Sequence, residues 1–73
     1  MKFIKYSNIF GDGAINVSHI VELHIERAFL DGKPLNNDWG VVAQLSFGQG
    51  SRIIFIGDDQ ECENYIDNLI KGI

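Results

Sequence analysis

Three residues near the middle of the chain carry side chains that could act together. Glu22, His24 and Glu26 alternate with apolar residues, so in an extended strand they project from one face. Two carboxylates and an imidazole can bind a divalent metal ion or transfer protons. Alternate side chains on one strand point outward in parallel, about 7 Å apart, and converge poorly on one ion. We therefore interpret this set as an ordinary solvated strand face.

Cys62 is the only cysteine in the sequence, so no disulfide can form within the chain. A thiol in the first turns of a helix can be a nucleophile, because the helix terminus lowers its pKa. Here four acidic residues surround Cys62 and the residue falls on an apolar stripe. Negative neighbours and burial both raise a thiol pKa, so we interpret Cys62 as a small core residue.

Two glycine segments, residues 11–13 and 48–50, join predicted strands. A phosphate-binding loop needs a glycine turn that leads into the start of a helix. We therefore interpret both segments as hairpin turns. The sequence predicts no catalytic residue, no metal ligand and no cofactor.

The negative charge of the chain is concentrated at its C-terminal end. The net charge is −4, and residues 58–71 hold five acids and one base, which accounts for the whole imbalance. Asp59, Glu63 and Asp67 are four residues apart, so they share one side of a helix. That side is either a solvated face or a docking surface for a basic partner. The six bases are scattered along the chain, which argues against binding to nucleic acids.

The spacing of apolar residues predicts an α+β fold: an antiparallel β-meander of about four to five strands, with one C-terminal amphipathic helix packed on one face. We expect strands over residues 2–6, 14–17, 20–29, 39–47 and 52–56. In the third strand, Val21, Leu23 and Ile25 occupy the covered face. Residues 30–38 contain Asp-Gly, Lys-Pro and Asn-Asn pairs, so we expect the longest loop there.

A helix is expected over residues 58–71. Asp58 is a favourable N-cap, and Glu61 three residues later completes the pattern of a capping box. One apolar stripe follows at helical spacing, made by Cys62, Ile66, Leu69, Ile70 and Ile73. The stripe needs an apolar partner, and the alternating face of the sheet provides one.

The opposite face of this sheet is also apolar. Val42 points to it, together with either Ile53 and Phe55 or Ile54 and Ile56, and Trp39 stands at a strand edge. Either the long loop and the N-terminus fold over this face, or a second copy covers it. We favour the second copy, and hence a homo-oligomer. The candidate interface residues are Val42, Ile54, Ile56 and Trp39.

Residues 1–73 are expected to form a single small domain, and the hydrophobic fraction of 45% is typical of globular proteins. The longest apolar run is far too short to span a membrane, and the N-terminus lacks a secretion signal. The segment from Ala14 to Ile20, followed by an alternating strand, a glycine hairpin and an Asp-capped helix, resembles small uncharacterised bacterial or phage-type proteins. Those proteins have a β-meander and one C-terminal helix. The resemblance implies a bacterial, non-enzymatic protein and supplies no site residues.

We therefore expect a non-enzymatic cytoplasmic module that self-associates and binds a protein partner. The alternative is an acidic inhibitor or regulator, which docks Asp59, Glu63 and Asp67 on a basic or nucleic-acid-binding protein. The third and least favoured hypothesis is a metal-dependent enzyme with its site at Glu22, His24 and Glu26. We expect neither a membrane nor a nucleic acid as a direct partner.

Overall fold

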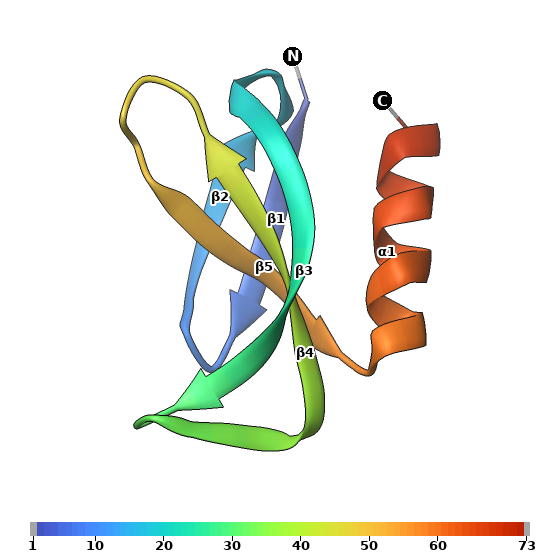
Figure 1. Cartoon of the computed structure of the whole chain (residues 1–73). Coiled ribbons are helices and arrows are strands. Elements are labelled where there is room, and N and C mark those ends of the chain that lie inside the picture. Colours follow the sequence, from blue (N-terminus) through green and yellow to red (C-terminus); the bar gives the residue numbers. More distant parts are fainter. Residues whose placement is uncertain (1, 73) are drawn as a thin grey trace.

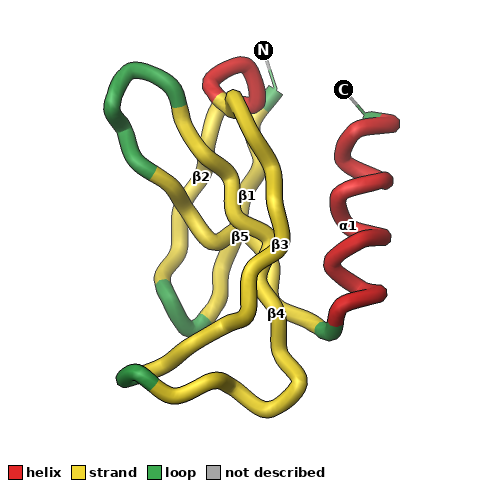
Figure 2. The backbone as a smooth tube through the Cα atoms, viewed as in Figure 1, coloured by secondary structure: helices red, strands yellow, loops and turns green. Residues whose placement is uncertain are grey.

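The computed structural model describes residues 2–72, and the side chains of residues 35–37 lie outside this description, as does Ile73. The elements in chain order are β1 (Phe3–Asn8), β2 (Gly11–Asn16), the 3-10 helix η1 (Val17–His19), β3 (Ile20–Leu30), β4 (Lys33–Leu45), β5 (Ser51–Gly57) and α1 (Asp59–Lys71). β1 and β2 form a two-stranded antiparallel sheet, and β3, β4 and β5 form a three-stranded one (Figures 1 and 2). The predicted α+β fold, with antiparallel strands and one C-terminal helix, is confirmed.

The connection between β3 and β4 is a tight turn, so the long loop predicted for residues 30–38 is wrong. Asp31 and Gly32 have φ angles of 53° and 80°. Positive φ at both central residues defines a type I′ turn, which matches the twist of the flanking strands and favours Asp-Gly. Pro34 is accommodated because β5 pairs with β4 only from Trp39 onward, so β4 has a single partner at the proline.

The turn between β1 and β2 lies at Ile9 and Phe10, before the predicted glycine turn, and residues 11–13 begin β2. Gly13 faces Tyr6 across the hairpin. A Cβ atom at Gly13 would lie 2.7 Å from the Tyr6 hydroxyl oxygen. This glycine therefore provides space for an aromatic ring rather than a turn conformation.

The core lies where α1, the three-stranded sheet and the β1–β2 hairpin meet. Its buried residues are Ile15, Val41, Ala43, Leu45, Ile54 and Cys62. Phe55 of β5 stacks on Tyr65 of α1 with ring centroids 4.6 Å apart. The Asn8 amide Nδ2 donates a hydrogen bond to the Ile53 carbonyl oxygen at 2.8 Å, which ties the hairpin to β5.

A bulge in β5 explains why residues 53–56 are apolar on both faces. Val41 pairs with Phe55 and Val42 pairs with Ile53, so Ile54 is an extra residue on its strand. Ile54 belongs to the core, with 4% of its surface exposed, and Val42 is 6% exposed.

The candidate interface predicted from the sequence therefore needs correction. Val42 and Ile54 are buried within one chain, while Trp39 and Ile56 are half-buried. Trp39 packs against the core and lies under the Arg27 guanidinium, 5.4 Å from the ring centroid. These four residues do not form an exposed apolar surface. Two of the four predicted contact residues are thus buried within the chain, and self-association stays a prediction.

α1 begins as predicted. Asp58 Oδ1 accepts a hydrogen bond from the Glu61 N–H at 2.8 Å, and Glu61 Oε1 accepts one from the Asp58 N–H at 3.0 Å. This capping box satisfies two backbone donors at the start of the helix. Among the residues that the structure describes, no helix is long and apolar enough to cross a membrane.

Candidate functional site: the edge of β3 and its groove

β3 forms one edge of the three-stranded sheet, since β4 is its only partner among the described residues. Register shifts between Ile20 and Glu22 and between Arg27 and Phe29 bound a regular segment, residues 22–27. Along such an edge, every second residue turns its backbone N–H and C=O away from the sheet. An exposed row of backbone groups is a template for one more strand.

A groove of about 590 Å³ lies between β3 and the C-terminal half of α1. Its apolar walls come from Ile20, Val21 and Leu23 on one side and from Ile66 and Ile70 on the other, and Lys2, Ser18 and Glu22 add polar groups to the lining. Figure 1 shows α1 standing beside β3, with the C-terminus of the helix close to the start of the chain. The Lys2 ammonium, which lines this groove, donates a hydrogen bond to the Gly72 carbonyl oxygen just after α1.

Two apolar side chains of the groove face solvent: Val21 is 65% exposed and Ile70 is 59% exposed. Val21 was predicted on the covered face with Leu23 and Ile25, and for Val21 this is wrong. Since Ile20 pairs with Leu45 and Glu22 with Gln44, Val21 is the extra residue of a bulge. Leu23 and Ile25 pack against the core as predicted.

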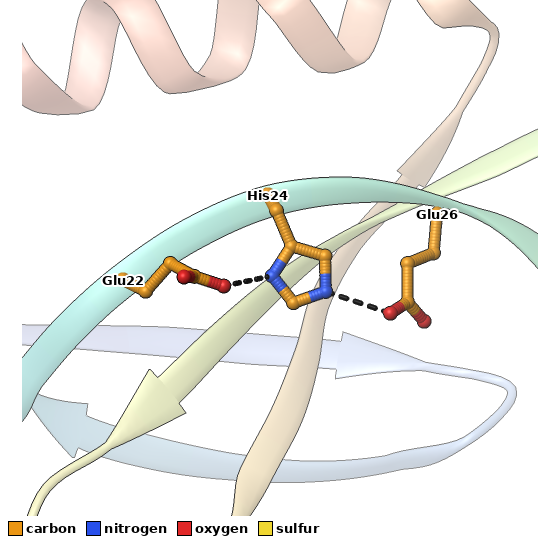
Figure 3. A network of polar contacts seen from close by, with 3 residues as sticks. All are labelled: Glu22, His24 and Glu26. Atoms are coloured by element: carbon orange, nitrogen blue, oxygen red, sulfur yellow. Dashed lines mark hydrogen bonds and ion pairs between the residues drawn. The ribbon is translucent and has the colours of Figure 1, made fainter.

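The side chains of the polar row Glu22, His24 and Glu26 project from β3 away from α1 (Figure 3), and Glu22 also borders the groove. The sequence predicted three parallel, independent side chains, but the imidazole lies between the two carboxylates. His24 Nε2 is 2.7 Å from Glu26 Oε1 in a hydrogen bond. His24 Nδ1 is 2.8 Å from Glu22 Oε2, an ion-pair contact that lacks hydrogen-bond geometry.

This arrangement favours the protonated imidazole. The hydrogen bond with Glu26 raises the pKa of His24 above its ordinary value of 6.5, partial desolvation opposes the rise, and Glu22 adds to it. The side chain of His24 is 32% exposed, so solvent screens these interactions. When His24 is protonated, the polar row holds a cation between two carboxylates and still carries a net negative charge.

Replacing His24 with glutamine is expected to destabilise the protein only where the imidazole is charged. Because the pKa is raised in the folded state, the contribution is complete below the unfolded value of 6.5 and disappears as the pH rises through the folded value. We expect His24→Gln to lower the free energy of unfolding by roughly 0.5 kcal/mol at pH 5.5, as exposed ion pairs do. Urea denaturation at pH 5.5 and pH 9 measures this. An equal loss at both pH values would mean that the side chain acts by packing.

The acidic residues predicted on the helix are where the sequence placed them. Asp59, Glu63 and Asp67 are exposed, and the opposite side of α1 packs on the core through Cys62 and its neighbours. Within residues 2–72, no lysine or arginine forms a salt bridge with them. Exposed acidic residues fit both a solvated helix face and a docking surface, so both alternatives stay open.

The other candidates from the sequence have structural roles. Cys62 is completely buried, and its Sγ donates to the Trp39 carbonyl oxygen at 3.4 Å. Desolvation by burial raises the pKa of the thiol above its ordinary value. A hydrogen bond with the Gly57 backbone lowers this pKa, and the nearby acidic residues at the start of α1 raise it. This confirms Cys62 as a core residue. Residues 48–50 belong to the connection between β4 and β5, as predicted.

The groove is the feature that sequence reasoning missed. Ile66 and Ile70 were assigned to a stripe that the sheet would cover, and Val21 to the covered face of a strand. The local sequence pattern does not indicate the groove, because Ile66 and Ile70 fit an ordinary core-facing helical stripe. The position of β3 at an edge depends on strand order, which the sequence does not specify.

Comparison of the chain with known protein families, with curated proteins and with solved structures found no match. Its function is therefore inferred from the edge of β3, the groove and the polar row.

Proposed function

We propose that this chain is a non-enzymatic interaction module that binds an extended segment of a partner protein along β3. The observation that carries the proposal is the largely apolar groove between α1 and β3, at a place where β3 is an edge strand of the sheet. A segment added beside β3 extends the sheet through backbone hydrogen bonds. Its side chains on the helix side enter the groove. In strand addition generally, backbone hydrogen bonds provide affinity and pockets for alternate side chains provide specificity.

The dimensions support this mode of binding. Residues 22–27 pair regularly with β4, and six residues of strand span roughly 20 Å at about 3.4 Å per residue. The groove volume of about 590 Å³ falls within the range of about 300–1,000 Å³ that binding sites occupy. Val21 and Ile70 leave apolar surface in water, and a partner side chain would remove it.

The two earlier hypotheses fit the structure less well. Self-association through the reverse face of the sheet loses Val42 and Ile54, which are buried. Docking of the acidic helix has exposed residues, but Asp59, Glu63 and Asp67 do not line the groove between β3 and α1. We place the proposed module in the cytoplasm, where a reducing environment keeps its one thiol free.

Selection from a random peptide display library against the full chain tests the proposal. We expect enrichment of extended segments with apolar residues at alternate positions. A synthetic version of an enriched peptide should shift the backbone amide resonances of residues 20–27 and 66–70. Selection that enriches no peptide, or shifts centred on Asp59, Glu63 and Asp67, would overturn binding at β3.

Matched variants connect that binding to the groove. Val21→Asp and Ile70→Asp each place a charge in the apolar groove, at positions exposed enough to leave the core intact. We expect each to weaken peptide binding by about tenfold or more, because the bound peptide would bury the new carboxylate. Phe47→Asp is the control, since Phe47 is 87% exposed in the β4–β5 connection. It should leave binding unchanged.

A further inference from the structure

We infer that the segment bound along β3 is basic: an extended peptide in which lysine or arginine alternates with apolar residues. Its cations face Glu22 and Glu26, and its apolar side chains enter the groove between β3 and α1. This inference rests on the proposed function and adds the chemistry of the partner.

The two faces of β3 differ in the way that such a peptide requires. Leu23 lines the groove and packs on the core. Glu22 and Glu26 belong to the polar row, with 61% and 62% of their side-chain surface exposed (Figure 3), and Glu22 also borders the groove. Side chains directly opposite each other on neighbouring antiparallel strands have Cβ atoms about 4.5–5.5 Å apart. A strand added beside β3 therefore brings every second side chain within reach of these carboxylates.

The carboxylates have capacity for a further cation. Each uses one oxygen on the imidazole, Glu22 Oε2 and Glu26 Oε1. In the part of the chain that the structure describes, no lysine or arginine pairs with either residue. Two carboxylates against one imidazolium leave a net negative charge even when His24 is protonated. Lysine or arginine would form charge-assisted hydrogen bonds with the remaining oxygens.

The cations of this region are engaged elsewhere. Arg27, at the end of the regular segment, lies over the Trp39 ring, 5.4 Å from its centroid. Lys2, at the groove, donates to the Gly72 carbonyl. The negative charge of the polar row is thus available to a partner.

A second copy of this chain is a poorer occupant of the same edge. Two β3 edges side by side bring four carboxylates and two imidazoles onto one face. Like charges on neighbouring strands are destabilising, and charged side chains on an edge strand discourage pairing between edges. A neutral or acidic peptide leaves Glu22 and Glu26 partly desolvated with no compensating cation.

Three synthetic peptides of equal length test the inference, in which valine alternates with lysine, serine or glutamate. Fluorescence anisotropy with the full chain at low salt is expected to show the lysine peptide binding about tenfold tighter than the serine peptide. The glutamate peptide should bind more weakly than both. Raising the ionic strength should reduce the lysine preference, because the carboxylates are exposed.

Two charge-matched double variants locate the effect. Glu22→Gln with Glu26→Gln should reduce the lysine preference to about twofold or less, while binding of the serine peptide is retained. Glu63→Gln with Asp67→Asn removes the same charge from α1 and should leave the preference intact. An equal loss in both variants would overturn the inference in favour of a general charge effect.

The remaining outcomes separate this inference from the proposed function. Binding of all three peptides with equal affinity, lost in Val21→Asp, overturns the inference and leaves the proposed function standing. No binding of any peptide overturns both. Sedimentation that shows a dimer of the unmodified chain at micromolar concentration, dissociated by Val21→Asp, would identify a second copy as the occupant.

Discussion

Ile54→Ala is expected to destabilise the protein by about 2–5 kcal/mol, the usual effect of truncating a buried isoleucine. Ile54 is the extra residue of the β5 bulge, 4% exposed and part of the core. Small domains have a total stability of roughly 5 kcal/mol or more, so this loss removes a large fraction of it. Urea denaturation followed by circular dichroism measures the change.

Phe47→Ala is the control for this experiment. Phe47 is 87% exposed, so its truncation should change the free energy of unfolding by about 0.5 kcal/mol or less. If Ile54→Ala were as stable as the parent chain and instead impaired assembly, Ile54 would be an interface residue, as the sequence suggested. The comparison thus decides between a core role and a surface role for one side chain.

The thiol of Cys62 is expected to react with an aromatic disulfide reagent on the order of 10³-fold more slowly in the native protein than in guanidinium chloride. Cys62 is 0% exposed, and its Sγ donates to the Trp39 carbonyl oxygen. Burial also raises the pKa of the thiol, so the reactive thiolate is rare in the folded state. Labelling must then proceed through opening of the structure, and the open fraction of a stable domain is on the order of 10⁻³ or below.

Absorbance at pH 8 under both conditions measures the labelling rates. The rate in the native protein should rise as urea is added below the unfolding transition, because opening becomes more frequent. Rapid native labelling with no dependence on urea would contradict the buried position and restore Cys62 as a candidate nucleophile at the start of α1.

Local chemistry made several elements predictable. Asp58 and Glu61 form the capping box that their spacing predicts. Asn16 accepts a hydrogen bond from the Ser18 N–H at the start of η1, a contact between residues two apart. In each case the interacting groups lie within three residues of each other. The outcome therefore depended on local chain geometry.

The errors arose where one residue changes the register of a strand. Val21 and Ile54 are both extra residues of bulges. Side chains alternate with a period of two, so a single inserted residue moves everything after it to the other face. The alternation of Val21, Leu23 and Ile25 contains no mark of the bulge. The Asp31-Gly32 pair did contain a hairpin signal, but the neighbouring proline and asparagines favoured a loop.

The sequence by itself determined the class of fold, the helix and its cap, the alternation of Leu23 and Ile25 with Glu22, His24 and Glu26, and the burial of Cys62. All of these depend on periodicity or on contacts between close neighbours in the chain. Only the tertiary structure decided that β3 is an edge, that Val21 and Ile70 border one groove, and that Ile54 is core. These features result from strand order and bulge position. Both depend on how the whole chain buries its apolar surface, and the pattern within a short segment does not reveal this.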